Sequence, residues 1–195
     1  MTQTKTRDYI IIATITTIEK YGIQHVTTRR IAEEAGVNNA ALHYYFGTKE
    51  NLVAQALALS LKHMMEDTDA ILSTNEEYSE RLKTLFLYLS DGVVKFPNLI
   101  RAHIVGPIME GDPNGPFLDM LDAWLKRTTA EFETNLSDEA HQRLRMAFQS
   151  AISTLLFAGL IPEKQGVSTS IDLHDVASRD EMIKMLVDTI VRQLG

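Results

Sequence analysis

The sequence contains no cysteine. Disulfides, thiolate zinc sites and cysteine nucleophiles are therefore excluded, and the absence fits a reducing cytoplasm. The N-terminus also lacks the apolar run of a signal peptide, and the longest apolar stretches, such as 155–161, are far too short to span a membrane. We therefore expect a cytoplasmic protein with no membrane partner.

Positive charge is also in short supply. The net charge of −7 argues against a generic nucleic-acid coat protein, while the apolar content of 45% is enough for a core. The shortage is uneven, because residues 1–50 hold six basic and five acidic side chains and the rest of the chain holds thirteen basic and twenty-one acidic ones. An acidic body of this kind repels other polyanions, so a polyanionic partner would be directed toward the N-terminal part.

Catalytic and metal-binding patterns are missing as well. The six histidines are scattered and form no H-x-x-x-H pair, and the G-x-G-x-x-G, G-x-S-x-G and P-loop patterns are absent. Nearby carboxylates such as Asp119 and Asp122 are explained more simply by a charged helix face. We therefore expect no enzyme, and no catalytic residue, metal ion or cofactor.

The stretch from Val26 to Lys49 does contain closely spaced signals for helix caps, helical faces and a turn. Thr27 precedes a helical run over 28–35 and can cap it with its hydroxyl oxygen. The inward face of this run holds Ile31, Ala32 and Ala35. Gly36 then ends the helix, since glycine adopts the left-handed conformation that helix ends favour.

A second short helix is predicted over 39–46, with Asn38 as its cap. Leu42 and Phe46 are spaced to bury with Ile31, and Tyr45 lies at the edge. The outward positions are Ala40, Ala41, His43 and Tyr44.

Two short helices joined by a glycine turn are typical of the DNA-binding helix-turn-helix, although a plain helical hairpin has the same outline. Alanine allows close approach to a thymine methyl, Asn39 can pair with adenine, and His43 and Tyr44 can contact bases or phosphates. Arg29 and Lys49 lie near helix starts, where free N–H groups also attract phosphate. The predicted DNA-binding residues are Thr27, Thr28, Arg29, Asn38, Asn39, Ala40, Ala41, His43, Tyr44 and Lys49.

The stretch T-T-R-R-I-A-E-E-A-G-V-N-N-A-A-L-H-Y-Y-F-G-T-K-E-N-L closely resembles the DNA-binding motif of TetR-family transcriptional regulators. The match is dense from about Arg7 to Leu57, and beyond it only length and helical character agree. The resemblance implies a homodimeric regulator, usually a repressor, that binds a palindromic operator on double-stranded DNA and is released by a small molecule. Two positions depart from the family, which usually has an acidic residue at Arg30 and often a tyrosine at His43, so the exact contact list stays open.

The rest of the chain also has helical periodicity. We predict an all-α protein of about nine helices, with a first helix over 6–21 and later ones over 49–72, 76–95, 98–110, 117–135, 138–160 and 179–194, and a loop over 162–178. Gly106 and Pro107 should disturb the sixth of these helices. Residues 1–55 are predicted to form the three-helix DNA-binding head, and residues 56–195 the helical effector-binding and dimerisation body.

The homodimer is predicted to form through the last two helices, as the resemblance implies, with Leu155, Phe157, Met185 and Ile190 as candidates. Methionine and aromatic side chains of the middle helices are candidate ligand-binding residues, although such side chains at helical spacing more often form plain core. These candidates are His103, Met109, Met120, Trp124 and Phe148. The alternative is a ligand-independent architectural or nucleoid-associated protein. The operator, the effector and the regulated genes are not determined by the sequence.

Overall fold

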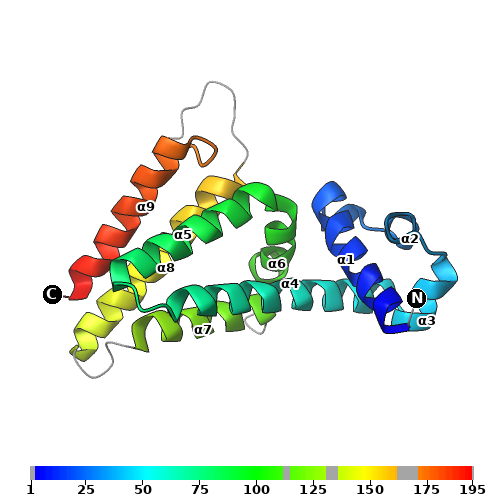
Figure 1. Ribbon diagram of the computed structural model, residues 1–195, viewed down its shortest axis with the longest axis horizontal. Coiled ribbons are helices and arrows are strands. Elements are labelled where there is room, and N and C mark those ends of the chain that lie inside the picture. The colour runs from blue at the N-terminus through cyan, green and yellow to red at the C-terminus, as the bar shows by residue number, and fades with distance from the viewer. Residues whose placement is uncertain (1–2, 112–114, 131–135, 162–170, 195) are drawn as a thin grey trace. The chain divides into compact units, whose positions relative to one another are not determined.

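The computed structural model describes residues 3–111, 115–130, 136–161 and 171–194, with the backbone alone at 3–4 and 105–110 (Figure 1). Within these ranges the chain forms nine α-helices and no strand, which confirms the all-α prediction. The helices are α1 Gln3–Tyr21, α2 Thr28–Ala35, α3 Asn39–Phe46, α4 Lys49–Leu72, α5 Tyr78–Lys95, α6 Pro97–Glu110, α7 Pro116–Thr129, α8 Asp138–Leu160 and α9 Val176–Val191. The described residues also include the short 3-10 helices η1 Ile23–His25 and η3 Arg192–Leu194.

The chain divides into two compact units. Unit 1 comprises Met1–Met65 and Asn98–Leu118, and unit 2 comprises Glu66–Pro97 and Asp119–Gly195. Helices α4 and α7 contribute to both units. The functional division into a head over 1–55 and a body over 56–195 stays a prediction.

The core of unit 1 is built by α1, α2, α3 and the first turns of α4. Its buried side chains include Ile10, Ile11, Ile18, Val26, Ile31, Leu42, Phe46, Leu52 and Ala56. Burying each large aliphatic or aromatic side chain stabilises the fold by about 1.5–3 kcal/mol. On α1 the buried side chains include Ile10, Ile11, Thr14 and Ile18, whereas Ile15 is only half-buried.

Helix α6 packs with the N-terminal helices in unit 1. The Asn98 side chain donates from Nδ2 to the backbone oxygen of Glu19, and the backbone N–H of Leu99 donates to Oε2 of the same residue, both at 2.9 Å. The Glu19 carboxylate of α1 thus satisfies a free N–H group at the start of α6, where the helix dipole also favours negative charge. Ala102, one turn further on, is buried in the same core.

The expected disturbance of α6 at Gly106 and Pro107 is wrong, because α6 runs as one helix from Pro97 to Glu110. A proline inside a helix removes one backbone hydrogen bond, but the remaining bonds can carry the helix across it. The start of α6 is also held independently by α1.

In unit 2, α5 packs against α8 and α9. The inward face of α5 buries Leu82, Leu85, Phe86 and Leu89. Phe86 meets Phe148 of α8 with the ring centroids 5.9 Å apart. Further along, α8 approaches α5 so closely that a Cβ atom on Gly159 would lie 2.1 Å from Cγ1 of Val93.

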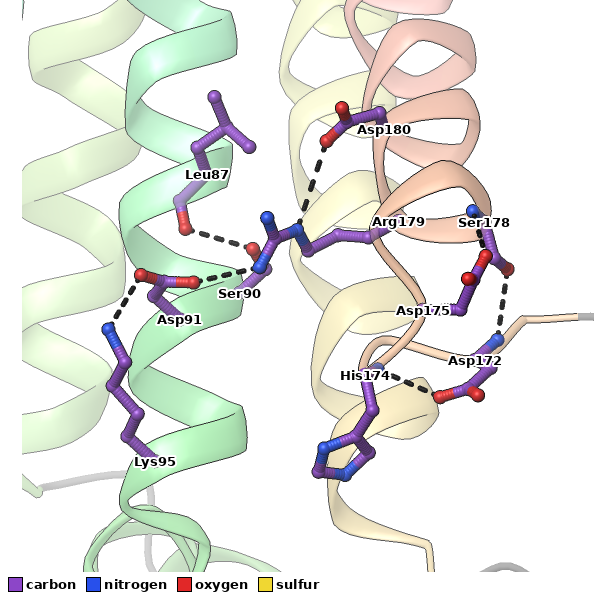
Figure 2. Close-up of polar contacts among 10 residues, drawn as sticks. All are labelled: Leu87, Ser90, Asp91, Lys95, Asp172, His174, Asp175, Ser178, Arg179 and Asp180. Carbon is purple, nitrogen blue, oxygen red and sulfur yellow. Dashed lines mark hydrogen bonds and ion pairs between the residues drawn. The ribbon is translucent and has the colours of Figure 1, made fainter.

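Polar contacts fix the start of α9 in unit 2 (Figure 2). Asp175 caps the helix by accepting from the backbone N–H of Ser178 at 2.8 Å. Arg179 donates from Nη1 to Oδ1 of Asp91 on α5 at 2.9 Å, while Oδ2 of Asp91 accepts from Lys95 at 2.8 Å. The hydrogen bond from Lys95 holds the pKa of Asp91 below its ordinary value.

Three other expectations need correction. Helix α9 begins at Val176 rather than 179, because Asp175 supplies the cap that the sequence pattern did not single out. Helix α7 ends at Thr129, where threonine hydroxyls bond back to carbonyls of the preceding turn; the expected continuation over 131–135 lies outside the described residues. The pattern of helical spacing also predicts His63 on the inward stripe of α4 together with Leu52, Ala56 and Leu59; His63 is exposed, and Leu61 is buried instead. Among the described residues, no helix combines the length and apolarity needed to cross a bilayer.

Candidate nucleic-acid interface

The ends of α2 and α3 are set by local chemistry. The Thr27 hydroxyl accepts from the backbone N–H of Arg30 at 3.3 Å, and Oδ1 of Asn38 accepts from the backbone N–H of Ala41 at 3.0 Å. Gly36 closes α2 in the left-handed conformation, at φ 65° and ψ 31°. These contacts confirm the predicted caps and turn, and they place α3 directly after α2.

The first turn of α4 continues this pattern. The Thr48 hydroxyl accepts from the backbone N–H of Asn51 at 3.1 Å. The Asn51 side chain also donates from Nδ2 to the backbone oxygen of Phe46 at 2.8 Å, which ties the end of α3 to the start of α4. This second contact has no signal in the sequence, because it depends on the position of the preceding helix.

Helix α3 has one buried and one exposed face. Leu42 and Phe46 are buried and Tyr45 is half-buried, as predicted. The exposed face carries Asn39, Ala40, His43 and Tyr44. Ala41 was expected to point outward but is half-buried, because its position on the helix falls between the two faces.

Two ring contacts order this exposed face. Tyr44 has 72% of its surface exposed, and its ring stands edge-on to Tyr45 with the centroids 5.0 Å apart. The Nδ1 atom of His43 lies 2.9 Å from the backbone oxygen of Gly47, the residue that follows α3. Both side chains are therefore oriented by neighbours while one edge of each remains free for a partner.

The predicted phosphate contacts are available. Arg29 of α2 pairs with Glu33 at 2.9 Å, and this hydrogen bond raises the pKa of the guanidinium. The Arg29 side chain is 83% exposed, and such surface pairs contribute little to stability, so a phosphate can replace the carboxylate at small cost. Lys49, at the start of α4, is half-buried, with Nζ 3.7 Å from Glu50.

Arg30, one of the two departures from the TetR pattern, has a local partner in the fold. Its guanidinium carbon lies 4.3 Å from the centroid of the Tyr21 ring, and Nη1 donates to the backbone oxygen of His25 at 2.6 Å. A cation–π contact and a hydrogen bond thus hold α2 against the connection that follows α1. The positive charge near the start of α2 is therefore compensated within the protein, without a phosphate.

Residues far apart in the sequence also support α3. The guanidinium of Arg7 lies 5.4 Å from the centroid of the Phe46 ring and donates to Gln55 of α4. Lys20 of α1 pairs with Glu34 of α2 at 2.7 Å. Neither contact can be predicted from the sequence pattern, because a pairing between distant residues leaves no periodic signal in the chain.

The candidate ligand residues fall in both units. His103 of α6 lies in unit 1, where its Nε2 atom is 2.8 Å from the Ser60 hydroxyl and its ring stacks on Phe117 with the centroids 6.4 Å apart. Burial lowers the pKa of His103 to about 4, since an imidazolium would lose its hydration there. The ring is therefore neutral near pH 7.

Three other candidates, Met120, Trp124 and Phe148, lie in unit 2 and are buried. The indole N–H of Trp124 donates to the Thr68 hydroxyl at 2.8 Å, which satisfies its polar group within the core. The side chain of Met109 lies outside the described residues. A role of these residues in ligand binding stays a prediction.

Comparison with known proteins agrees with the geometry of the N-terminal helices. Residues 10–56 match the family model described as bacterial regulatory proteins, tetR family. The HTH-type transcriptional regulator BetI of Brucella anthropi is 35% identical over 79 residues, which are 40% of this chain and 41% of that protein. The BetI protein of Agrobacterium fabrum is 33% identical over 79 residues, covering 40% of this chain and 38% of that one. The chain thus matches about two fifths of the length of these relatives.

Solved structures resemble the whole chain. A putative transcriptional regulator from Streptomyces coelicolor A3(2) has a TM-score of 0.65 at 20% identity, covering 98% of this chain and 99% of that one. A putative TetR-family regulator from Mesorhizobium loti MAFF303099 has a TM-score of 0.67 at 14% identity, covering 98% of each chain. At these identities the similarity shows the fold.

Proposed function

We propose that this chain, whose N-terminal helices match the model of bacterial regulatory proteins of the tetR family, is a sequence-specific DNA-binding transcriptional regulator. One observation carries the proposal: α3 exposes Asn39, Ala40, His43 and Tyr44 while its opposite face is fixed in the core. Such a helix can enter the major groove without reorganising its scaffold.

We propose that the protein acts as a homodimer on a palindromic operator. One short recognition helix contacts too few base pairs to define a unique site, so two heads are needed, about 34 Å or one DNA turn apart. The last two helices supply the proposed interface, because Phe157 of α8 and Met185 of α9 are 66% and 62% exposed. Leu155 and Ile190, the other two candidates, are buried inside the protomer and belong to its own core.

The spacing of exposed apolar side chains supports this interface. Met146 and Phe157 are both exposed on α8 and are eleven residues apart, which is close to three helical turns and places them on one face. Large exposed apolar side chains gathered on one face are typical of a surface that a partner covers.

We further propose that a small-molecule effector releases the protein from DNA, so that it works as a repressor. The support is that α6 is bonded to α1 through Glu19 and to α4 through the pair of His103 and Ser60. A ligand that favours another position of α6 would therefore act on α1 and on the first half of α4, which begins at Lys49. Linkage then requires operator DNA to weaken ligand binding by the same factor.

The experiment is selection of duplexes from a random library by the purified full-length protein, followed by footprinting. The expected result is a short palindrome, protected at two half-sites, that binds at least 1000-fold better than random DNA, as is usual for specific sites. Binding that never exceeds the random-duplex level would refute the proposed function. Dispersed, weakly selected sites would favour an architectural protein instead.

A further inference from the structure

The hydrogen bond between His43 and Gly47 fixes where the imidazole carries its proton. Nδ1 of His43 lies 2.9 Å from the backbone oxygen of Gly47. A carbonyl oxygen only accepts hydrogen bonds, so Nδ1 must be the donor. In the neutral ring the other nitrogen, Nε2, then has no hydrogen and presents a lone pair.

This arrangement restricts what His43 can contact. Phosphate oxygens are acceptors, and a lone pair on Nε2 cannot donate to them. In the major groove guanine N7 and O6, adenine N7 and thymine O4 are acceptors as well. The only donors there are the exocyclic amino groups of adenine, at N6, and of cytosine, at N4.

The position of His43 suits such a contact. His43 is exposed and follows Asn39 by four residues, so the two side chains lie on the same exposed face of α3, one turn apart. Asn39 is the predicted adenine partner in the first turn, and His43 would contact a neighbouring base pair along the groove.

We propose that His43 is a specificity-determining residue whose Nε2 atom accepts a hydrogen bond from the amino group of adenine or cytosine in the operator. The proposal rests on the proposed function, because it requires α3 to lie in the major groove. The rival role is a protonated His43 that donates from Nε2 to a phosphate, and the two roles differ in their dependence on sequence.

The first test needs no DNA. Nitrogen NMR of the full-length protein at pH 8, above the ordinary titration range of histidine, distinguishes a protonated from an unprotonated ring nitrogen. The His43 signals are assigned by their loss in His43→Gln. The expected spectrum has the proton on Nδ1 of His43. The exposed His63, for which the proposal predicts no particular tautomer, serves as the control. A proton on Nε2 of His43 would overturn the proposal.

The second test uses the duplex obtained by selection. Each adenine or cytosine of one half-site is replaced in turn by purine or 2-pyrimidinone, which lack the exocyclic amino group. At one position this change should weaken binding of the wild-type protein about three- to tenfold, the worth of one hydrogen bond. Purine and 2-pyrimidinone also weaken their own base pair, and that effect is common to both proteins. The loss of affinity on replacing the base should therefore be larger for the wild-type protein than for His43→Ala, and this excess loss measures the hydrogen bond to His43.

Replacement of His43 by lysine, whose ammonium group can only donate hydrogen bonds, provides the complementary test. His43→Lys should shift the preference at that base pair from an amino-bearing base toward guanine, whose O6 and N7 accept from lysine. His63→Ala, a change of another exposed histidine, should leave all preferences unchanged. If His43→Ala weakens every duplex equally, or if no amino position responds differently in the two proteins, His43 is a phosphate contact or no contact at all. Absence of any selected duplex would instead refute the proposed function itself.

Discussion

Replacement of Gly159 by alanine tests how α8 packs on α5. An added Cβ atom would lie 2.1 Å from Cγ1 of Val93 and 3.1 Å from Cδ1 of Leu173. Val93 is only 3% exposed, and a β-branched side chain on a helix has one strongly preferred rotamer, so its methyl group cannot simply turn away. The helices would have to separate locally.

The magnitude follows from two opposing effects. Overpacking of a core costs about 1–3 kcal/mol. Alanine in place of glycine inside a helix returns about 0.5–1 kcal/mol. The two ranges leave an expected net loss in the free energy of unfolding centred near about 1 kcal/mol, which lowers the melting temperature of a chain of this size by about 2–4 °C.

Gly92 of α5 provides the matched control. It is also helical, but apart from the neighbouring backbone of α5 itself no atom of the described residues lies within 4 Å of the position where its Cβ would stand. Gly92→Ala should therefore raise the free energy of unfolding by about 0.5–1 kcal/mol. Both variants are compared with the wild type by chemical denaturation at one protein concentration, because the proposed dimerisation would make apparent stability depend on concentration.

A double variant locates the clash. Val93→Ala removes the methyl group that a Cβ on Gly159 would meet, so Gly159→Ala should cost at least 1 kcal/mol less in that background than in the wild type. If Gly159→Ala is as stable as the wild type while Gly92→Ala behaves as expected, Gly159 of α8 does not lie in close contact with Val93 of α5, and the reasoning is refuted. Equal costs in both backgrounds would assign the loss to another cause.

Three further outcomes are expected. Phe157→Glu should convert the dimer to folded monomers in light scattering, whereas Leu155→Glu should unfold the protomer; a Phe157→Glu protein that stays dimeric would place the interface elsewhere. Arg29→Ala and Lys49→Ala should each weaken binding on all duplexes and reduce the slope of log affinity against log salt by about one, and an unchanged slope would remove that residue from the phosphate contacts. The depressed pKa of His103 means that the unfolded chain binds this proton more readily, so stability should fall as the pH drops from 6.5 toward 4, by up to about 3 kcal/mol. His103→Leu should remove that part of the pH dependence, and identical pH profiles of the two proteins would show that burial does not depress this pKa.

Much of the candidate interface was predictable from short-range patterns. The caps at Thr27 and Asn38 and the turn at Gly36 are predicted by the local sequence alone, and the structure has all three. Each depends on a side chain bonding to a backbone group three residues away, or on the freedom of glycine to adopt positive φ. Such interactions are encoded within one helical turn.

The orientation of the interface side chains was less predictable. Arg30 was expected to be a charge near a helix start, but it stacks on Tyr21 and donates to the carbonyl of His25. The bond of His43 to the Gly47 carbonyl also escaped the pattern, because it depends on the rotamer of an exposed ring. Helical spacing predicts the direction in which a side chain leaves the backbone. It does not predict the rotamer, which decides where the polar atoms of the side chain lie.

The sequence by itself determined that the chain is helical, and it located the two short helices and the turn between them. Only the tertiary structure decided that α6 packs in the core formed by the first four helices. Asn98 and Leu99 form hydrogen bonds to Glu19, and Ala102 is buried in that core. The physical reason is the distance along the sequence over which each kind of interaction acts. Apolar periodicity and caps act over three or four residues, whereas the contacts of Glu19 with Asn98 and Leu99 join residues about 80 positions apart, and they form only when both helices have found the same core.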